Sequence, residues 1–171
     1  MSLEFKKASL EIKDYIQDFV GEFIENGEEV VPMSVKMAYY DYDKWLIETA
    51  NFEKRETCPP NLVPSHTYFL INGPDRIIGA INIRHYLNEN LLKHGGHIGY
   101  GVRPSERKKG YATLMLKMAL PIAKELGIEK ALITCDKNNI ASANVIKNNG
   151  GVLENEIMIN GKITQRYWIE L

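Results

Sequence analysis

The first sixty residues place apolar side chains with the period of an α-helix. Seven of them recur at i, i+3 and i+4 spacing: Ile12, Tyr15, Ile16, Phe19, Val20, Phe23 and Ile24. This stripe predicts an amphipathic helix that ends at Gly27. A short strand is predicted before it over residues 3–7, and a second helix after it over residues 43–56. Residues 30–42 fit either a loop or a short helix, and a proline-rich break follows at 58–64.

Beyond that break, short apolar and β-branched runs replace the helical period. Six strands are predicted: 67–71, 76–84, 97–102, 130–135, 152–159 and 162–170. Turn sequences separate the first two strands at 72–75 and the last two at Asn160-Gly161, a pair that favours a type I′ hairpin turn. A polar loop is predicted over 86–96.

Two helices are predicted among these strands. The first covers residues 112–126, whose apolar stripe continues through Pro121 and stops before Gly127. The second runs from an N-cap at Asn139 to about residue 148. Early helices followed by a sheet with two inserted helices predict a mixed α/β fold, organised as a single domain over residues 1–171.

The composition and charge of the chain argue against several classes of function. Twenty-one Lys and Arg residues against 22 Asp and Glu residues give a net charge of −1, which argues against broad binding to nucleic acid or an anionic membrane. No apolar run approaches the ~20 residues of a membrane span, and no signal-peptide stretch begins the chain. The two cysteines and four histidines lack metal-ligand spacing, so we expect no metal and a reduced, cytoplasmic protein.

Three consecutive cations stand immediately ahead of the helix at 112–126: Arg107, Lys108 and Lys109. A helix N-terminus carries roughly +0.5 of an elementary charge and unpaired N–H groups, so cations there are repelled unless an anion binds. Gly110 would allow a phosphate to approach the backbone. The alternative interpretation is a solvated charge run that Glu106 partly balances. The residues alone leave both interpretations open.

The turn Arg-x-x-Gly-x-Ala, formed by Arg107, Gly110 and Ala112, resembles the signature turn of the GNAT superfamily of acyl-CoA-dependent N-acyltransferases. In that family the turn wraps the pyrophosphate of coenzyme A. The preceding segment 98–104 is similar to the family's strand before the turn. The segment 139–151, with Asn-x-x-Ser and a later Lys-x-x-Gly, is similar to its next helix.

The resemblance implies a mostly antiparallel, twisted central sheet with helices on both faces and two splayed strands that leave a slot for pantetheine. Acetyl-CoA would be the co-substrate, without a metal. The cofactor-binding residues would be Tyr100, Val102, Arg107, Lys108, Lys109, Gly110, Tyr111, Ala112, Asn139 and Ser142. Asn139 has an equally good interpretation as a simple helix cap.

The activity that the resemblance implies is N-acetyl transfer from acetyl-CoA to a primary amine of a small molecule or a peptide N-terminus, by direct attack in a ternary complex. The alternative is a non-catalytic acyl-CoA-binding or sensing domain. The alternative gains some support because Ile146 occupies the helix position where many family members carry a tyrosine.

Three residues are candidates for a catalytic role. His97 could accept the amine proton, because an imidazole near pKa ~6.5 does so at neutral pH, although ordinary hydrogen bonding at a strand end explains it as well. The backbone N–H near Tyr100 could hold the developing oxyanion. The proton for the leaving thiolate could come from the side chain of Tyr100 or Tyr167, from water, or from no dedicated group, and both tyrosines also fit packing roles.

The acceptor side is expected to lie between the first two helices, residues 30–42 and the loop 86–96. Carboxylates such as Glu28 and Asp41 could attract a cationic amine there, or could be ordinary surface residues. Cys135 lies in an apolar strand and is expected to be a buried, inert thiol. The closing strand near Tyr167 could pair across a homodimer.

Overall fold

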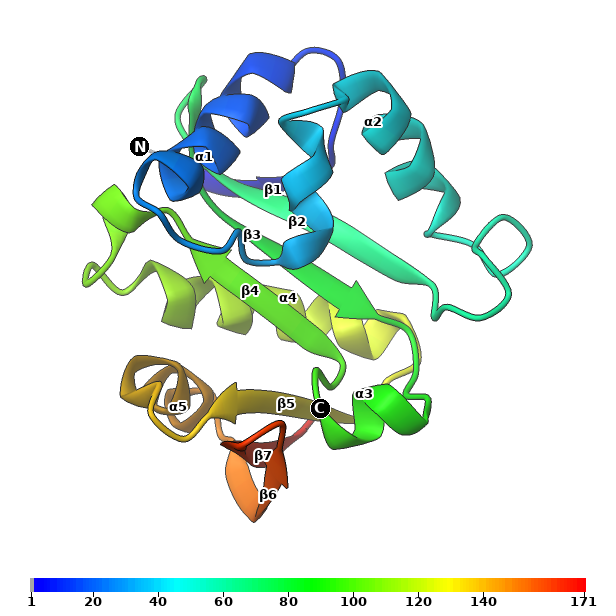
Figure 1. The fold of residues 1–171 in the computed structure, drawn as a ribbon, viewed down its shortest axis with the longest axis vertical. Helices are drawn as coiled ribbons and strands as arrows, with labels where there is room; N and C mark the ends of the chain where they lie inside the picture. The colour runs from blue at the N-terminus through cyan, green and yellow to red at the C-terminus, as the bar shows by residue number, and fades with distance from the viewer. Residues whose placement is uncertain (1) are drawn as a thin grey trace.

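The computed structural model describes residues 2–171 and shows two antiparallel sheets side by side (Figure 1). The elements in chain order are β1 Leu3–Lys6, α1 Lys13–Glu25, the 3-10 helix η1 Met33–Ala38, α2 Tyr42–Asn51, β2 Ser65–Asn72, β3 Arg76–Arg84, α3 Glu89–Lys93, β4 Ile98–Val102, the 3-10 helix η2 Pro104–Glu106, α4 Tyr111–Glu125, β5 Lys130–Asp136, α5 Ile140–Asn148, β6 Val152–Ile159 and β7 Lys162–Glu170. The strand orders are β1-β2-β3-β4 and β5-β7-β6. The predicted mixed α/β class is confirmed.

Helices cover both faces of the first sheet, because β3 carries apolar side chains on both of its faces. Alternate residues of β3 enter different apolar clusters: Ile77 and Ala80 pack with α1, α2 and η1, whereas Ile78 and Ile81 pack with α4. Side chains of a strand point alternately to its two faces, and a β-bulge opposite Leu70 and Ile71 shifts this alternation by one residue between Ile77 and Gly79, so β3 contributes side chains to both cores. Phe19 of α1 is fully buried against the first face, a burial that contributes about 1.5–3 kcal/mol.

The two sheets touch between β4 and β5 through residues at one end of β4. The backbone N–H of His97 donates to the Leu132 carbonyl at 2.7 Å. The Leu132 N–H in turn donates to His97 Nδ1 at 2.9 Å. A Cβ atom on Gly96 would lie 2.3 Å from the Leu132 oxygen, so only glycine permits this close approach. Beyond this junction β4 and β5 belong to different sheets, which leaves one edge of β4 without a strand partner among residues 2–171.

Two predicted boundaries were wrong, for local reasons. The helix predicted over 43–56 ends at Asn51 because the Phe52 carbonyl accepts the N–H of Ser65, which turns the chain toward β2. The predicted loop 86–96 contains the short helix α3, whose N-cap Asn88 accepts the N–H of Leu91 at 2.9 Å. Within residues 2–171, no helix has the length and apolar character needed to cross a bilayer.

Candidate functional site

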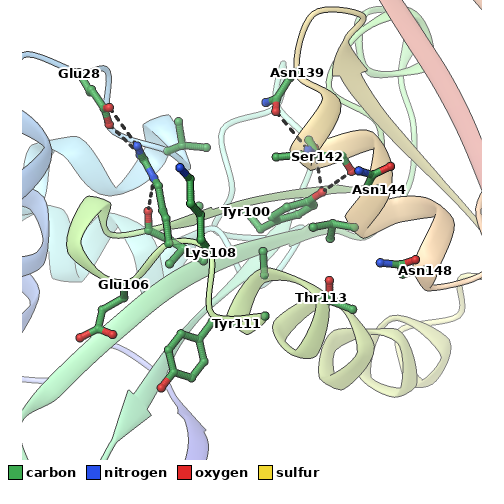
Figure 2. A pocket seen from close by; sticks show the side chains of 18 of the residues that line it. Glu28, Tyr100, Glu106, Lys108, Tyr111, Thr113, Asn139, Ser142, Asn144 and Asn148 are labelled. Carbon is green, nitrogen blue, oxygen red and sulfur yellow. Dashed lines mark hydrogen bonds and ion pairs between the residues drawn. The ribbon is translucent and has the colours of Figure 1, made fainter.

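A cavity of about 730 Å³ opens where β4, the basic turn, the start of α4 and the start of α5 meet (Figure 2). Its size falls in the range typical of ligand pockets. It brings together residues that are far apart in the sequence. The predicted binding residues that line it are Tyr100, Val102, Arg107, Lys108, Gly110, Tyr111, Ala112, Asn139 and Ser142.

The open edge of β4 forms one side of this cavity. Arg103 donates its N–H to Ile78 of β3, and hydrogen-bonding direction alternates along an antiparallel strand. The backbone groups of Tyr100 and Val102 therefore point away from β3, toward the cavity. The Val102 carbonyl accepts a bond from Arg107 Nε at 3.3 Å. An extended ligand along this edge would find backbone donors and acceptors already aligned.

The N-terminus of α4 lacks the usual capping groups. Its N-cap is Gly110, with φ of 83°, no side chain caps it, and no acidic residue lies in its first turn. Within residues 2–171, the N–H groups of residues 111–113 have no hydrogen-bond acceptor. Lys108 also adopts a positive φ, 62°, which shapes the turn. A Cβ on Gly110 would meet nothing within 4 Å, so glycine is needed here for its φ, and the space before the helix is open.

The three cations of the turn differ in their partners. Arg107 binds Glu28 with both terminal nitrogens, at 2.9 and 2.7 Å, and this bond holds the pKa of Glu28 below its usual value. Lys109 donates to Glu106 at 2.8 Å and does not line the cavity, so its place among the binding residues stays a prediction. Among the described residues that line the cavity, Lys108 is the cation without an ion pair.

Tyr100 reaches from β4 to α5 across the cavity (Figure 2). Its hydroxyl lies 2.9 Å from Ser142 Oγ, and the Ser142 N–H is capped by Asn139 Oδ1 at 3.1 Å. The structure thus confirms Asn139 as a helix cap. Burial raises the pKa of Tyr100 to about 12, so the phenol keeps its proton at neutral pH. Ile146 of α5 is fully buried in the core.

His97 does not line the cavity. It is 6% exposed, and its Nδ1 is occupied by the Leu132 N–H at the junction of the sheets. Burial, aided by the Arg84 guanidinium, lowers the pKa of His97 to about 4. Such a weak base with its acceptor nitrogen already used is poorly placed to take a proton from a substrate. The geometry therefore favours the hydrogen-bonding interpretation of His97.

The replacement His97→Asn should remove a source of acid instability. Because the folded-state pKa is lowered from 6.5 to about 4, the stabilisation is complete above pH 6.5 and is lost as the pH falls toward 4. We expect this loss to reach ~2 kcal/mol of unfolding free energy in the wild-type protein. Asn Oδ1 can still accept the Leu132 N–H but does not titrate. Urea unfolding at pH 7 and pH 4.5 checks this, and an unchanged pH dependence in the variant would contradict it.

Three polar lining residues were missed by the sequence analysis: Thr113 of α4, and Asn144 and Asn148 of α5. Residues 141, 144 and 148 lie on one face of a helix, which is the signal that could have identified them. Tyr167 is buried and donates to Gln165 at 2.8 Å, away from the cavity. Within residues 2–171, His, Cys, Asp and Glu side chains form no cluster of three or more that could hold a metal ion.

Comparison with known proteins points to one family. The model of the acetyltransferase (GNAT) domain matches residues 15–152. No curated protein matches the chain in sequence. Similar solved structures include the ribosomal-protein-S5-alanine acetyltransferase from Vibrio fischeri, with TM-score 0.72, 14% identity, and coverage of 99% of this chain and 93% of that one. RimL, a ribosomal alpha-N-protein acetyltransferase in complex with coenzyme A, has TM-score 0.70, 16% identity and coverage of 100% and 95%. The protein yncA from Salmonella typhimurium, with its cofactor acetyl-CoA, has TM-score 0.66, 13% identity and coverage of 100% and 95%.

Proposed function

The chain belongs to the acetyltransferase (GNAT) family, and we propose that it transfers an acetyl group from acetyl-CoA to a primary amine of a small molecule or a peptide N-terminus. One structural observation supports this proposal most directly. The uncapped N-terminus of α4 and the unpaired edge of β4 open into the same cavity. The free N–H groups at the start of α4 can bind a diphosphate. The unpaired backbone groups of β4 can form hydrogen bonds with the amides of a pantetheine arm.

The residues of the cavity fit coenzyme A in charge as well as in shape. The N–H groups of residues 111–113 and the ammonium group of Lys108 supply donors and positive charge for a diphosphate. Arg107 is held beside them by Glu28 and lies over the ring of Phe23 at 5.7 Å. Acetyl-CoA, when bound, supplies the acetyl group as an activated thioester. Two of the solved relatives contain coenzyme A or acetyl-CoA, which supports this assignment.

Two groups of Tyr100 would serve the transfer step. Its backbone N–H points away from β3 and can stabilise negative charge on the carbonyl oxygen of the acetyl group. Its hydroxyl keeps a proton at neutral pH and can donate that proton to the leaving sulfur. No covalent bond to the protein is required. Cys135 is buried, and burial raises the pKa of its thiol, so it is poorly suited as a nucleophile.

The position of the Tyr100 hydroxyl favours catalysis over the alternative of a non-catalytic acyl-CoA-binding domain. Ile146 stands where many family members carry a tyrosine, but Tyr100 brings a phenol to the same helix from β4. We propose that residues 1–171 act as one catalytic domain. The free cysteines Cys58 and Cys135 support a reducing, cytoplasmic setting.

Release of free thiol from acetyl-CoA in the presence of a panel of primary amines tests the proposal. We expect release that depends on the amine and yields an equal amount of acetylated product. Binding of acetyl-CoA without release for any amine or N-terminal peptide would support the binding domain instead. Absence of any coenzyme A binding would overturn both functions.

A further inference from the structure

Glu28 places a carboxylate inside the cavity that we expect to bind a diphosphate. It follows α1 in the chain and lines the cavity together with the cations Arg107 and Lys108 (Figure 2). Like charges repel, so a carboxylate at this place opposes the binding of an anionic ligand. The binding of coenzyme A therefore does not by itself explain why Glu28 is there.

Glu28 engages the part of Arg107 that best fits an oxyanion. The two terminal nitrogens of Arg107 donate to the two carboxylate oxygens at 2.9 and 2.7 Å, and its Nε donates to the Val102 carbonyl at 3.3 Å. A guanidinium binds a carboxylate or a phosphate most strongly through two parallel N–H groups. Both edges of the Arg107 guanidinium that offer such a pair are therefore engaged in this structure.

Other contacts hold Arg107 in place without Glu28. The guanidinium carbon lies 5.7 Å from the centre of the Phe23 ring, whose face attracts a cation. The bond from Nε to Val102 holds the guanidinium from a second direction. If the Glu28 carboxylate moves away, Arg107 keeps these two contacts, and its terminal nitrogens become available to another anion.

The Glu28 carboxylate can move away while the backbone stays in place. The Glu28 N–H donates to the Phe23 carbonyl at 2.9 Å, and Val30 is 3% exposed in the core, so the chain is anchored on both sides of the side chain. The side chains of the ion pair are 42% exposed for Arg107 and 35% for Glu28. An ion pair with this exposure contributes little to stability, so rotation of one side chain is enough to break it.

A diphosphate has what is needed to displace this carboxylate. It carries more negative charge, and it can bind the free N–H groups at the start of α4 and the ammonium group of Lys108 at the same time. Arg107 is ready for the diphosphate only in the fraction of empty protein in which Glu28 has moved away. The apparent affinity for the ligand is reduced by that fraction.

We propose that Glu28 is an internal competitor of the diphosphate: it occupies Arg107 in the empty protein, releases it when acetyl-CoA binds, and pairs with it again when coenzyme A leaves. This inference rests on the function proposed above. Its consequence is a limited affinity, which suits a co-substrate that must dissociate after every turnover. If Glu28 instead served to position Arg107 for the ligand, its removal would weaken binding, so the two roles predict effects of opposite sign.

Calorimetric titration of Glu28→Gln with coenzyme A tests this sign. We expect the variant to bind about fivefold more tightly than the wild-type protein, as the loss of an exposed ion pair in the empty state would give. Glu29→Gln is the matched control, because Glu29 lines the same cavity and has no ion pair within residues 2–171. This control should change the affinity about twofold at most. Unchanged or weaker binding by Glu28→Gln, or an equal gain in Glu29→Gln, would overturn the proposal.

The variant Arg107→Gln shows whether the gain depends on Arg107. In this background Glu28→Gln should improve the affinity less than about twofold, because no guanidinium remains to be released. A gain as large as in the wild-type background would mean simple repulsion between Glu28 and the ligand, and internal competition would then be wrong. Acetylated pantetheine, which lacks the diphosphate, should bind the wild-type protein and Glu28→Gln equally well. A tighter complex of this ligand with the variant would also contradict the proposal.

The same titrations distinguish this inference from the proposed function. If coenzyme A binds neither the wild-type protein nor Glu28→Gln, the proposed function is wrong, and the inference that rests on it is wrong as well. If the wild-type protein binds coenzyme A and Glu28→Gln gains no affinity, the proposed function stands and only the internal competition is wrong.

Discussion

Replacement of Lys108 by Glu will weaken the binding of coenzyme A about a hundredfold, because it removes a charged donor and adds a charge that repels phosphate. Lys108 lines the cavity beside the uncapped N-terminus of α4 and has no ion pair among the described residues. The loss should be equally large for acetyl-CoA, since both ligands carry the same diphosphate. Isothermal titration calorimetry measures it directly.

Lys109→Glu is the matched control for this variant. It changes the net charge by the same amount at the next residue, but Lys109 pairs with Glu106 and does not line the cavity. We expect less than a fivefold change in affinity, as is typical for a surface charge. Equal losses for the two variants would mean that the overall field, and not a contact at the turn, governs binding.

Tyr100→Phe will lower kcat about a hundredfold or more while leaving the affinity for acetyl-CoA nearly unchanged, because general acid catalysis contributes at least that much. The substitution removes only the hydroxyl that lies 2.9 Å from Ser142 Oγ. Stopped-flow measurement of thiol release, together with calorimetric affinities, separates the two parameters. Wild-type kcat in this variant would exclude Tyr100 as the proton donor.

The pH dependence of the rate and a variant of the neighbouring Ser142 make this test more specific. Since the pKa of Tyr100 is raised from 10.0 to about 12, its proton stays bound up to about pH 11. The rate of the wild-type protein should therefore show no loss from this group below pH 10. Ser142→Ala removes the hydrogen-bond partner but keeps the phenol, and we expect a much smaller fall in kcat than in Tyr100→Phe.

Local patterns predicted most of the fold, and tertiary contacts explain the exceptions. The helical stripe from Ile12 to Ile24 and the turn at Asn160-Gly161, with φ of 50° and 79°, are set by residues close in sequence. The end of α2 depends on the bond between Phe52 and Ser65, which are thirteen positions apart. Such a bond forms only once the chain between them has folded.

The sequence predicted the backbone features of the candidate site, but it did not predict the ion pairs of the side chains there. Three consecutive cations and Gly110 ahead of a helix indicated an anion site, and the structure shows that helix uncapped. Which cation is left without an ion pair depends on Glu28 and Glu106, which pair with Arg107 and Lys109. The role of His97 depends on Leu132 of another sheet. A local sequence pattern cannot predict interaction partners that lie far away along the chain.

The central claim is that the start of α4 binds the diphosphate of coenzyme A. Calorimetric titration with acetyl-CoA and with acetylated pantetheine, which lacks the diphosphate and the nucleotide, tests it most directly. The account predicts that acetyl-CoA binds about a thousandfold more tightly, as several charge-assisted hydrogen bonds together would give. Equal affinities for the two ligands would contradict it.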